Sequence, residues 1–254
     1  MPYNEVALII PCYNEIDGLP HLMSRLGSMR QSGQLQGWEV LFVNDGSRDG
    51  TGDALDRLAE ENDWIRVVHH EGNKGLGAAV RTGLANTSTP VICTMDSDCT
   101  FAPEALPDMV RMLGDGTGIV TASPWHPESR QGSVHPVRKL LSQGASWLYR
   151  RILSKGVHSF TSMHRAYRRE ALNKVEFQSN GFAAITEIMI RAMFNHSRIK
   201  ELPMPVNRRR FGESKINILQ SIAAHLSLMR LATWTLFIIW ADRKMAANQY
   251  VIEQ

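Results

Sequence analysis

Five short apolar runs alternate with helical patterns through the first half of the chain, and this alternation limits the fold more than any other feature of the sequence. The runs are Val6–Ile10, Glu39–Val43, Ile65–Val68, Val91–Met95 and Ile119–Thr121. Near-continuous apolar runs are typical of strands buried on both faces of a parallel sheet. Helices are expected between them, near residues 19–29, 51–59, 75–84 and 103–113. Repeated strand–helix units predict an α/β fold with a mainly parallel sheet and right-handed crossovers.

Polar turns follow the first, second and fourth of these strands. Ligands of open parallel sheets bind beyond the carboxyl ends of the strands, so these turns are expected to converge on one crevice. The turn after the fourth strand contains Asp96 and Asp98, two positions apart. If the strand continues through them, both carboxylates leave one face and can meet one cation. Mg²⁺ and Mn²⁺ prefer oxygen ligands, which indicates a nucleoside diphosphate with its metal; the alternative is that the two aspartates only start a turn.

The charge of the chain is distributed unevenly between its halves. Residues 1–129 carry 8 Lys and Arg against 18 Asp and Glu, whereas residues 130–254 carry 20 against 7. Nine basic residues and no acidic residue lie between Arg130 and Arg169. A solvated basic face is one interpretation of such a run. The other is an anionic partner, which can be a phosphate, a lipid headgroup or a nucleic acid.

Several classes of protein fit the sequence poorly. A dinucleotide-binding dehydrogenase needs a glycine-rich turn after its first strand, where this chain has Pro11-Cys12-Tyr13-Asn14-Glu15, and no GxxxxGK[ST] loop is present. The three cysteines, at positions 12, 93 and 99, have no CxxC spacing and indicate reduced thiols of a cytosolic protein. No signal peptide is recognised at the first residues. The apolar segment Leu231–Ala241 has eleven residues, which is too short to span a bilayer.

Six blocks of sequence, taken in order, carry a resemblance. They are PCYNE at 11–15, VNDGSRDGT at 43–51, GNKGLGAAVRTG at 72–83, MDSDCT at 95–100, TSMHRAYRREAL at 161–172 and NRRRFGESKI at 207–216. Over about residues 5–220 the chain resembles the family-2 glycosyltransferases, and within them the dolichol- or polyprenyl-phosphate sugar synthases. The resemblance implies a nucleotide-sugar-binding GT-A-type fold, a DxD motif that binds Mg²⁺ or Mn²⁺, a GDP- or UDP-sugar donor, and inversion at the anomeric centre.

The resemblance assigns the donor and metal residues position by position. Those of the donor site are Pro11, Tyr13, Glu15, Asn44, Asp45, Asp96, Ser97 and Asp98, and those of the metal site are Asp96, Asp98 and Thr100. Two positions depart from the family pattern. Asn44 stands where Asp is usual, which leaves open which base is read, and Thr100 stands where the synthases often have Gln.

The acceptor side is assigned in the same way and departs further from the pattern. Its phosphate-binding residues are Arg138, Ser142, Arg165, Arg209 and Lys215, of which Arg209 and Lys215 are suited to stabilising the departing pyrophosphate. The expected Gly-Ser-Arg-Tyr element reads Ala122-Ser123-Pro124-Trp125, and Arg130 is the candidate to replace its arginine. Glu187 is the candidate general base for a hydroxyl acceptor, whereas a phosphate acceptor needs no strong base.

These assignments predict a catalytic domain at residues 1–216, with a donor and metal half at 1–129 and an acceptor half at 130–216. Residues 217–254 are expected to form an amphipathic helix that packs on the body, lies in a membrane interface or pairs with another subunit. The predicted function is metal-dependent inverting transfer of a sugar to a polyprenyl-phosphate-type acceptor, in the cytoplasm or on its membrane face. The alternatives are transfer to a hydroxyl of a soluble acceptor and binding of nucleotide sugar without catalysis. No nucleic-acid-binding motif accompanies the basic half.

Overall fold

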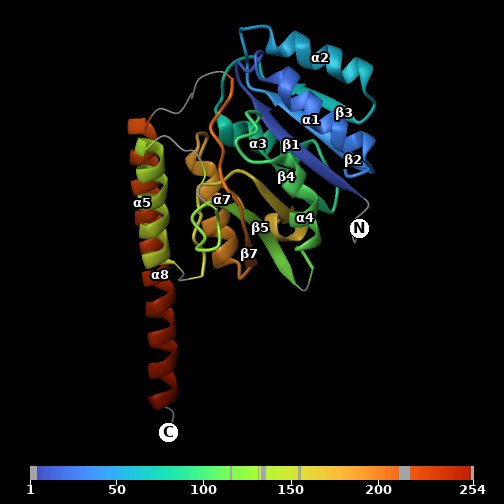
Figure 1. Ribbon diagram of the computed structural model, residues 1–254. Helices are drawn as coiled ribbons and strands as arrows, with labels where there is room; N and C mark the ends of the chain where they lie inside the picture. The colour runs from blue at the N-terminus through green and yellow to red at the C-terminus, as the bar shows by residue number, and fades with distance from the viewer. Residues whose placement is uncertain are drawn as a thin grey trace.

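The computed structural model describes residues 5–114, 116–130, 132, 136–153, 156–211 and 218–252, and it does not describe the side chains of residues 137, 138, 218 and 239–252. The first half alternates strands and helices as the sequence predicts (Figure 1). Its elements are β1 (Val6–Cys12), α1 (Leu19–Gln31), β2 (Trp38–Asn44), α2 (Thr51–Glu61), β3 (Ile65–His69), α3 (Leu76–Ala85) and β4 (Val91–Thr94).

The rest of the chain contains the fifth predicted strand and adds two strands that the apolar pattern did not reveal. Its elements are η1 (Pro103–Ala105), α4 (Leu106–Arg111), β5 (Thr117–Ser123), α5 (Pro136–Ile152), β6 (Arg165–Arg168), α6 (Arg169–Leu172), α7 (Ala183–Phe194), β7 (Arg198–Pro203) and α8 (Ile218–Ile252). The strands β6 and β7 are short, and polar residues make up much of both, so periodicity alone does not identify them.

All seven described strands form one sheet in the order β3-β2-β1-β4-β6-β5-β7. The β6 strand runs antiparallel to β4 and β5, and every other pairing in the sheet is parallel. The mainly parallel sheet is therefore confirmed. Strands β1 to β5 come from residues 1–129, and β6 and β7 come from residues 130–216. All of them lie in one sheet, so the expected donor and acceptor halves share it.

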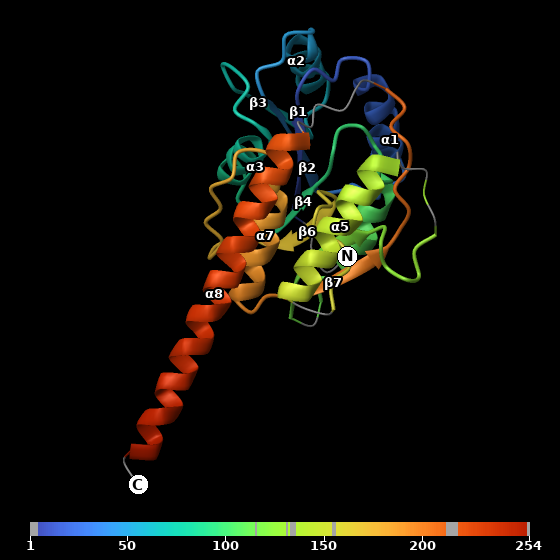
Figure 2. The same ribbon diagram turned by 90° about the vertical axis from the view of Figure 1, so that its left-hand side faces the viewer.

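Helices cover both faces of the sheet (Figure 2). The side chains of Val6, Leu8 and Ile10 pack on one face with α1, α2 and α4, and Ile9 on the other face packs with α3 and α7. This alternation explains why β1 is apolar at successive positions, since each of its faces meets a helix layer. The carboxyl ends of β1, β2 and β4 remain uncovered by these two layers.

The first strand extends through Pro11 to Cys12, two residues beyond the apolar run Val6–Ile10. Pro11 pairs with Val43 of β2, whereas the pairing of β1 with β4 ends at Ile9 and Thr94. Proline has no backbone N–H to donate. The pairing with β4 has already ended before Pro11, so β4 requires no hydrogen bond from this residue. Conversely, β4 ends at Thr94, so Asp96 and Asp98 lie in a turn and the expected continuation of the strand through them is wrong.

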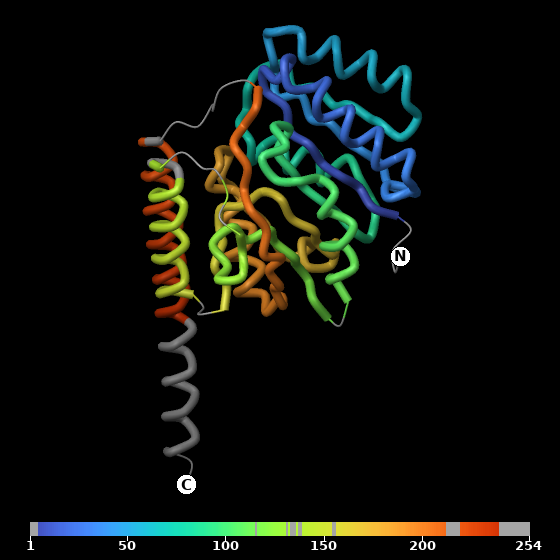
Figure 3. The backbone as a smooth tube through the Cα atoms, viewed as in Figure 1, coloured from blue at the N-terminus to red at the C-terminus, as the bar shows by residue number. Residues whose placement is uncertain are grey.

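A third apolar cluster joins α5 and α8 to α7 at the side of the sheet (Figures 1 and 2). Leu228 and Ala232 of α8 are buried there, and the hydroxyl of Tyr149 in α5 lies 3.0 Å from Nδ1 of His225. The tail therefore forms the expected helix, and the described part of α8 lies beside α5 and packs on the body (Figure 3).

The exposed side of α8 is apolar as well, which an amphipathic helix would not show. Leu219, Trp234 and Phe237 are 80%, 62% and 54% exposed. The stretch Leu219–Ile238 has 20 residues and a mean hydropathy of 1.3, so length and composition would allow it to cross a membrane. The expectation of a segment of eleven residues was wrong because it treated Arg230 as a boundary, although the helix continues through this residue.

Candidate active site

A cavity of about 550 Å³ lies at the carboxyl ends of β1, β2 and β4. Its walls come from the turns after these strands, from the start of α3, from the loop before α7, from Arg209 and from the first turns of α8. Seven of the eight predicted donor residues line it: Pro11, Tyr13, Glu15, Asp45, Asp96, Ser97 and Asp98. The expected convergence of polar turns on one crevice is therefore present, although the assignment of each residue to a ligand stays a proposal.

The acidic side of the cavity is organised around Arg209. One terminal nitrogen of its guanidinium donates to both carboxylate oxygens of Glu15, and the other lies 3.8 Å from Oδ2 of Asp98. Its Nε donates to the carbonyl of Phe211 at 2.6 Å, which fixes the direction of the side chain. The side chains of Arg209, Glu15 and Asp98 are 17%, 10% and 8% exposed, so the charges meet with little solvent between them. Glu15 and Arg209 are 194 positions apart, and only the fold brings them together.

Asp96 and Asp98 fit a divalent metal by their chemistry. Both line the cavity, and Oδ1 of Asp98 accepts the backbone N–H of Thr100 at 3.0 Å. This bond shapes the turn and directs Oδ2 toward Arg209. Carboxylate oxygens at the mouth of a polar cavity are the donor type that Mg²⁺ and Mn²⁺ prefer. Thr100, which the resemblance added to the metal set, is 2% exposed and is not among the residues that line the cavity.

The segment after β1 that is predicted to bind the donor is held by the loop that follows β2. The N–H of Asn14 donates to Oγ of Ser47, and the N–H of Glu15 donates to Oγ1 of Thr51, each at 2.9 Å. Asp49 accepts from Ile16 and Thr51, and these hydrogen bonds outweigh its partial burial and lower the pKa of its carboxyl. Tyr13 and Glu15 are thus positioned by the backbone and by polar side chains of the neighbouring turn.

The amide of Asn44 is used inside the protein. Its Nδ2 lies 3.0 Å from Nδ1 of His69, its Oδ1 accepts the N–H of Ser47, and Nε2 of His69 lies 2.8 Å from a carboxylate oxygen of Asp56. An amide at position 44 can donate to a ring nitrogen of His69, which a carboxylate in that place cannot do. Asn44 is 5% exposed and does not line the cavity, so a role in reading the base gains no support.

The carboxylate of Asp45 stabilises the part of the cavity wall that leads into α3. Its Oδ1 accepts the N–H of Lys74 at 2.8 Å and lies 2.7 Å from Nδ1 of His70, and its Oδ2 accepts the N–H of Gly75 at 2.8 Å. The sequence predicted that Asp45 binds the donor nucleotide, and it did not reveal the bonds to Lys74, Gly75 and His70. The side chain is 3% exposed, so its main described partners are within the protein.

Glu187 lies in α7 and is 3% exposed. It accepts the N–H of Gln178 at 3.2 Å, the N–H of Ser179 at 2.9 Å and Nε of Arg191 at 2.8 Å. Burial alone would raise the pKa of the Glu187 carboxyl, but these hydrogen bonds outweigh it and lower the pKa. A carboxylate held in its ionised form by three donors is a poor general base, and Glu187 does not line the cavity.

The loop that Glu187 anchors does line the cavity, and sequence reasoning missed it. The residues from Ser179 to Ala183 form this wall, and the N–H of Gly77 donates to the carbonyl of Asn180 at 2.6 Å. A Cβ at Gly77 would lie 2.1 Å from the carbonyl oxygen of Ser179, so only glycine allows α3 and this loop to approach so closely. The glycines of the GNKGLG block were the available signal.

The predicted acceptor residues are spread over different surroundings. Arg165 is 0% exposed and donates to Oγ1 of Thr121 and to the carbonyls of Ile185 and Phe160. We therefore leave Arg165 out of the proposed acceptor set, because its guanidinium is buried and bonded to groups within the protein. Ser142 of α5 bonds to Trp125 and Thr161. The side chain of Arg138 and the whole of Lys215 lie outside the described residues.

The three cysteines are buried and unpaired. Cys12 lines the cavity, and burial is the main reason why the pKa of its thiol is raised above the ordinary value. A neutral thiol is a weak nucleophile, so the cavity offers no cysteine suited to covalent catalysis.

Two relatives show how closely the sequence follows characterised proteins. The chain is 32% identical over 223 residues to a polyprenol monophosphomannose synthase of Mycolicibacterium smegmatis, covering 85% of this chain and 82% of the relative. It is 31% identical over 218 residues to an undecaprenyl-phosphate mannosyltransferase of Micrococcus luteus, covering 84% and 87%.

Solved structures share the fold at lower identity. The glucosyl-3-phosphoglycerate synthase of Mycobacterium tuberculosis, in complex with Mn²⁺, uridine diphosphate and glucosyl-3-phosphoglycerate, superposes with a TM-score of 0.64 at 18% identity, over 91% of this chain and 79% of that chain. A mannosyltransferase of Pyrobaculum calidifontis in complex with GDP-Man and Mn²⁺ gives 0.62 at 18%, over 92% and 64%. The expected GT-A-type fold is therefore confirmed.

The family assignment rests on the sequence. The family described as "Glycosyl transferase family 2" matches residues 7–176, which include β1 to β6 and most of the cavity wall. Together with relatives above 30% identity over most of both chains, this match identifies the protein as a glycosyltransferase that belongs to glycosyl transferase family 2.

Proposed function

We propose that the protein transfers a sugar, with inversion, from a GDP- or UDP-sugar to a polyprenyl phosphate in the presence of Mn²⁺ or Mg²⁺. The observation that carries this proposal is the meeting of Glu15, Asp98 and Arg209 in the cavity beyond β1 and β4. A polar cavity with carboxylates and a cation on one side suits a nucleoside diphosphate and its metal. The relatives are named for polyprenol or undecaprenyl-phosphate substrates, which supports the acceptor class.

The residues of the cavity have separate proposed roles. Asp96 and Asp98 hold the metal, which when bound neutralises charge on the nucleoside diphosphate. Pro11, Tyr13 and Glu15 hold the nucleoside, with Glu15 accepting from ribose hydroxyls. Arg209 contacts Glu15 and lies near Asp98 at the edge of the cavity, and we propose that it turns toward the leaving pyrophosphate. Lys215 and Arg138 remain proposed phosphate-binding residues outside the described side chains.

The state of Glu187 favours a phosphate acceptor over a hydroxyl acceptor. Its carboxylate accepts from Gln178, Ser179 and Arg191, and the bonds lower its pKa. A hydroxyl nucleophile needs a base to remove its proton, whereas a phosphate is already an anion at neutral pH. We propose that Glu187 positions the loop between α6 and α7 and does not act as a general base for the acceptor.

We further propose that α5 and α8 bring the protein to a membrane that contains the acceptor. Leu140 and Trp147 of α5 and Leu219 and Trp234 of α8 are all more than half exposed. The basic run of residues 130–169 includes Lys139, Arg150 and Arg151 of the same helix α5. Apolar side chains beside cations are typical of helices that lie on anionic lipid. Location on the cytoplasmic side and self-association stay predictions of the sequence.

A donor and acceptor screen tests the function. Purified protein is incubated with GDP-mannose, UDP-glucose and other nucleotide sugars, with Mn²⁺ or chelator, and with either polyprenyl phosphate in vesicles or soluble hydroxyl acceptors such as 3-phosphoglycerate. Release of nucleoside diphosphate and the glycosylated product are measured. We expect metal-dependent transfer to the polyprenyl phosphate only. Transfer only to the hydroxyl acceptors would overturn the acceptor class, and tight donor binding without any transfer would favour a binding protein.

A further inference from the structure

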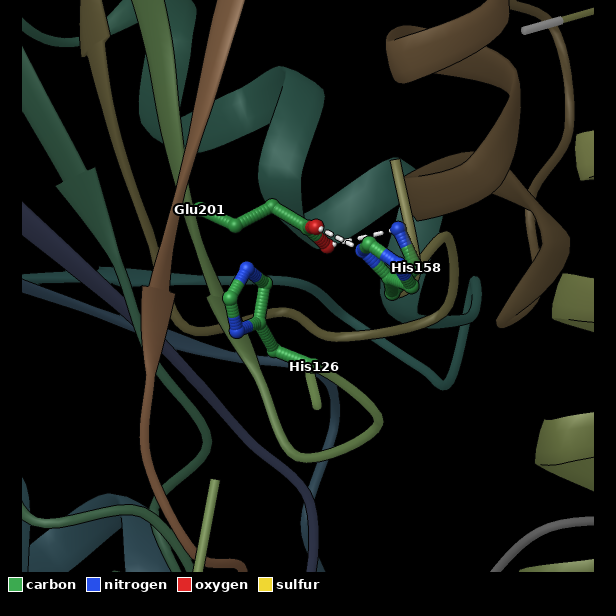
Figure 4. A group of neighbouring side chains, drawn as sticks. All are labelled: His126, His158 and Glu201. Atoms are coloured by element: carbon green, nitrogen blue, oxygen red, sulfur yellow. Dashed lines mark hydrogen bonds and ion pairs between the residues drawn. The ribbon is translucent and has the colours of Figure 1, made fainter. Parts of the chain in front are cut away.

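Two histidines and a glutamate form a compact cluster outside the donor cavity (Figure 4). His126 follows β5, His158 precedes β6, and Glu201 lies in β7. One ligand atom from each side chain lies within 4.8 Å of the other two. The side chains of His158 and Glu201 are 17% and 6% exposed, and none of the three residues lines the donor cavity.

An ion pair accounts for only two members of this cluster. Oε1 of Glu201 accepts the backbone N–H of His158 at 2.8 Å and that of Ser159 at 2.9 Å, and Oε2 lies 2.7 Å from Nδ1 of His158. These bonds fix the positions of the His158 imidazole and the Glu201 carboxylate relative to each other. Within the described part of the chain, no hydrogen bond joins His126 to either partner, and its ring meets that of His158 edge-on with centroids 5.0 Å apart.

The surroundings of His126 direct its imidazole into the cluster. Its Nδ1 accepts the N–H of Glu128 at 3.2 Å, so the turn itself holds the ring in place. Trp125, the preceding residue, donates from its indole to Oγ of Ser142 in α5, and Ser142 also bonds to Thr161. The turn that carries His126, helix α5 and the segment that carries His158 are therefore already connected on one side of the molecule.

The donor set differs in chemistry from that of Asp96 and Asp98. Two imidazoles and a carboxylate suit Zn²⁺ and related first-row metals, whereas carboxylates alone suit Mg²⁺ and Mn²⁺. Zn²⁺ lies about 2.0–2.2 Å from nitrogen or oxygen ligands. Its ligands are then about 3.5 Å apart, so His126 needs to approach the other two side chains by roughly an ångström, and the 2.7 Å contact between Nδ1 of His158 and Oε2 of Glu201 needs to open by about as much. When His126 binds the metal through Nε2, the proton of the imidazole is on Nδ1. The 3.2 Å hydrogen bond that Nδ1 accepts from the N–H of Glu128 is then lost.

We propose that His126, His158 and Glu201 bind a second divalent metal, of the Zn²⁺ class, that fixes helix α5 on the body. His126 precedes α5 and His158 follows it, so a metal bound to both closes the segment that contains the helix, and Glu201 attaches that closure to β7. Closing such a segment removes conformational freedom from the unfolded chain and stabilises the folded one. Three protein ligands leave a coordination position for water.

The test uses Zn²⁺ binding by the whole protein after removal of metal with a chelator. It is carried out in an Asp98→Ala background, so that the proposed donor metal site does not contribute. Calorimetry is expected to show one site, and Zn²⁺ at 100 times its Kd is expected to raise Tm by about 5 °C or more. Substitution of Co²⁺ should give the visible absorption bands of a low-coordinate site.

The informative variant is His126→Ala, because it removes a ligand and leaves the pair of His158 and Glu201 intact. We expect Zn²⁺ affinity to fall at least about tenfold and the rise in Tm to disappear, with little change in the stability of the metal-free protein. His196→Asn is the matched control, since it removes an exposed histidine at a left-handed backbone position that asparagine tolerates. No Zn²⁺ binding above that of bulk protein, or equal affinity in His126→Ala and His196→Asn, would overturn the proposal.

Discussion

Replacing Arg209 by glutamine should change metal affinity and turnover in opposite directions. The guanidinium pairs with Glu15 and lies 3.8 Å from Oδ2 of Asp98, one of the two carboxylates proposed to hold the metal. The positive charge of Arg209 therefore lies beside a proposed metal-binding carboxylate, where it opposes the binding of a cation. If the same side chain turns to the departing pyrophosphate, its loss removes an interaction that is strongest in the transition state.

The size of the effect follows from the geometry. At 3.8 Å and an effective dielectric constant of about 20, the attraction between Arg209 and Asp98 is about 4 kcal/mol before the costs of burial are subtracted. Exposed fractions of 17% and 8% leave little screening by water. Removing this competing positive charge should strengthen Mn²⁺ binding at least about tenfold. Loss of a charge-stabilising donor typically lowers kcat by about 10²–10³.

The assay measures Mn²⁺ affinity by calorimetry without nucleotide, and kcat and KM at saturating metal. Arg210→Gln is the matched control, because Arg210 is the exposed neighbour of Arg209 and carries the same charge. Tm of each variant is measured as well, since the loss of the Glu15 pair will lower stability. An unchanged kcat in Arg209→Gln, or Mn²⁺ affinity that falls together with kcat, would refute the assigned role.

Three further predictions concern the metal, Glu187 and the loop beside α3. Asp98→Ala should abolish the difference in nucleoside diphosphate affinity between Mn²⁺ and chelator measured by calorimetry, and a persistent difference would place the metal elsewhere. Glu187→Gln should keep transfer to polyprenyl phosphate. Near-complete loss of transfer would restore Glu187 as a base. Because the folded-state pKa of Glu187 is lowered, its contribution to stability is present near neutrality and is lost as pH falls below about 4. The free energy of unfolding of Glu187→Gln should therefore depend less on pH in the acid range. Gly77→Ala should cost about 1–3 kcal/mol in the free energy of unfolding and weaken donor binding, whereas Gly27→Ala, with open space around its Cβ, should be neutral or stabilising in denaturant titrations.

The donor side of the site was predictable because its residues are tied to local patterns. Pro11, Tyr13, Asp96 and Asp98 directly follow apolar runs, and parallel strands bring their carboxyl ends to one edge. The acceptor side was less predictable. Arg165 has the sequence context of a phosphate ligand, but it lies in the short strand β6 with its side chain directed into the interior. A period-two pattern does not tell which face of a four-residue strand meets solvent.

The sequence by itself determined the alternating α/β framework, the crevice at its carboxyl edge and the family, since each depends on local apolar periodicity or on contiguous motifs. The tertiary structure decided which side chains face that crevice. The pairing of Arg209 with Glu15 and the meeting of His126 with Glu201 join segments that lie far apart in the sequence. Such contacts depend on strand order and on close packing between distant elements, and no local pattern in the chain encodes either.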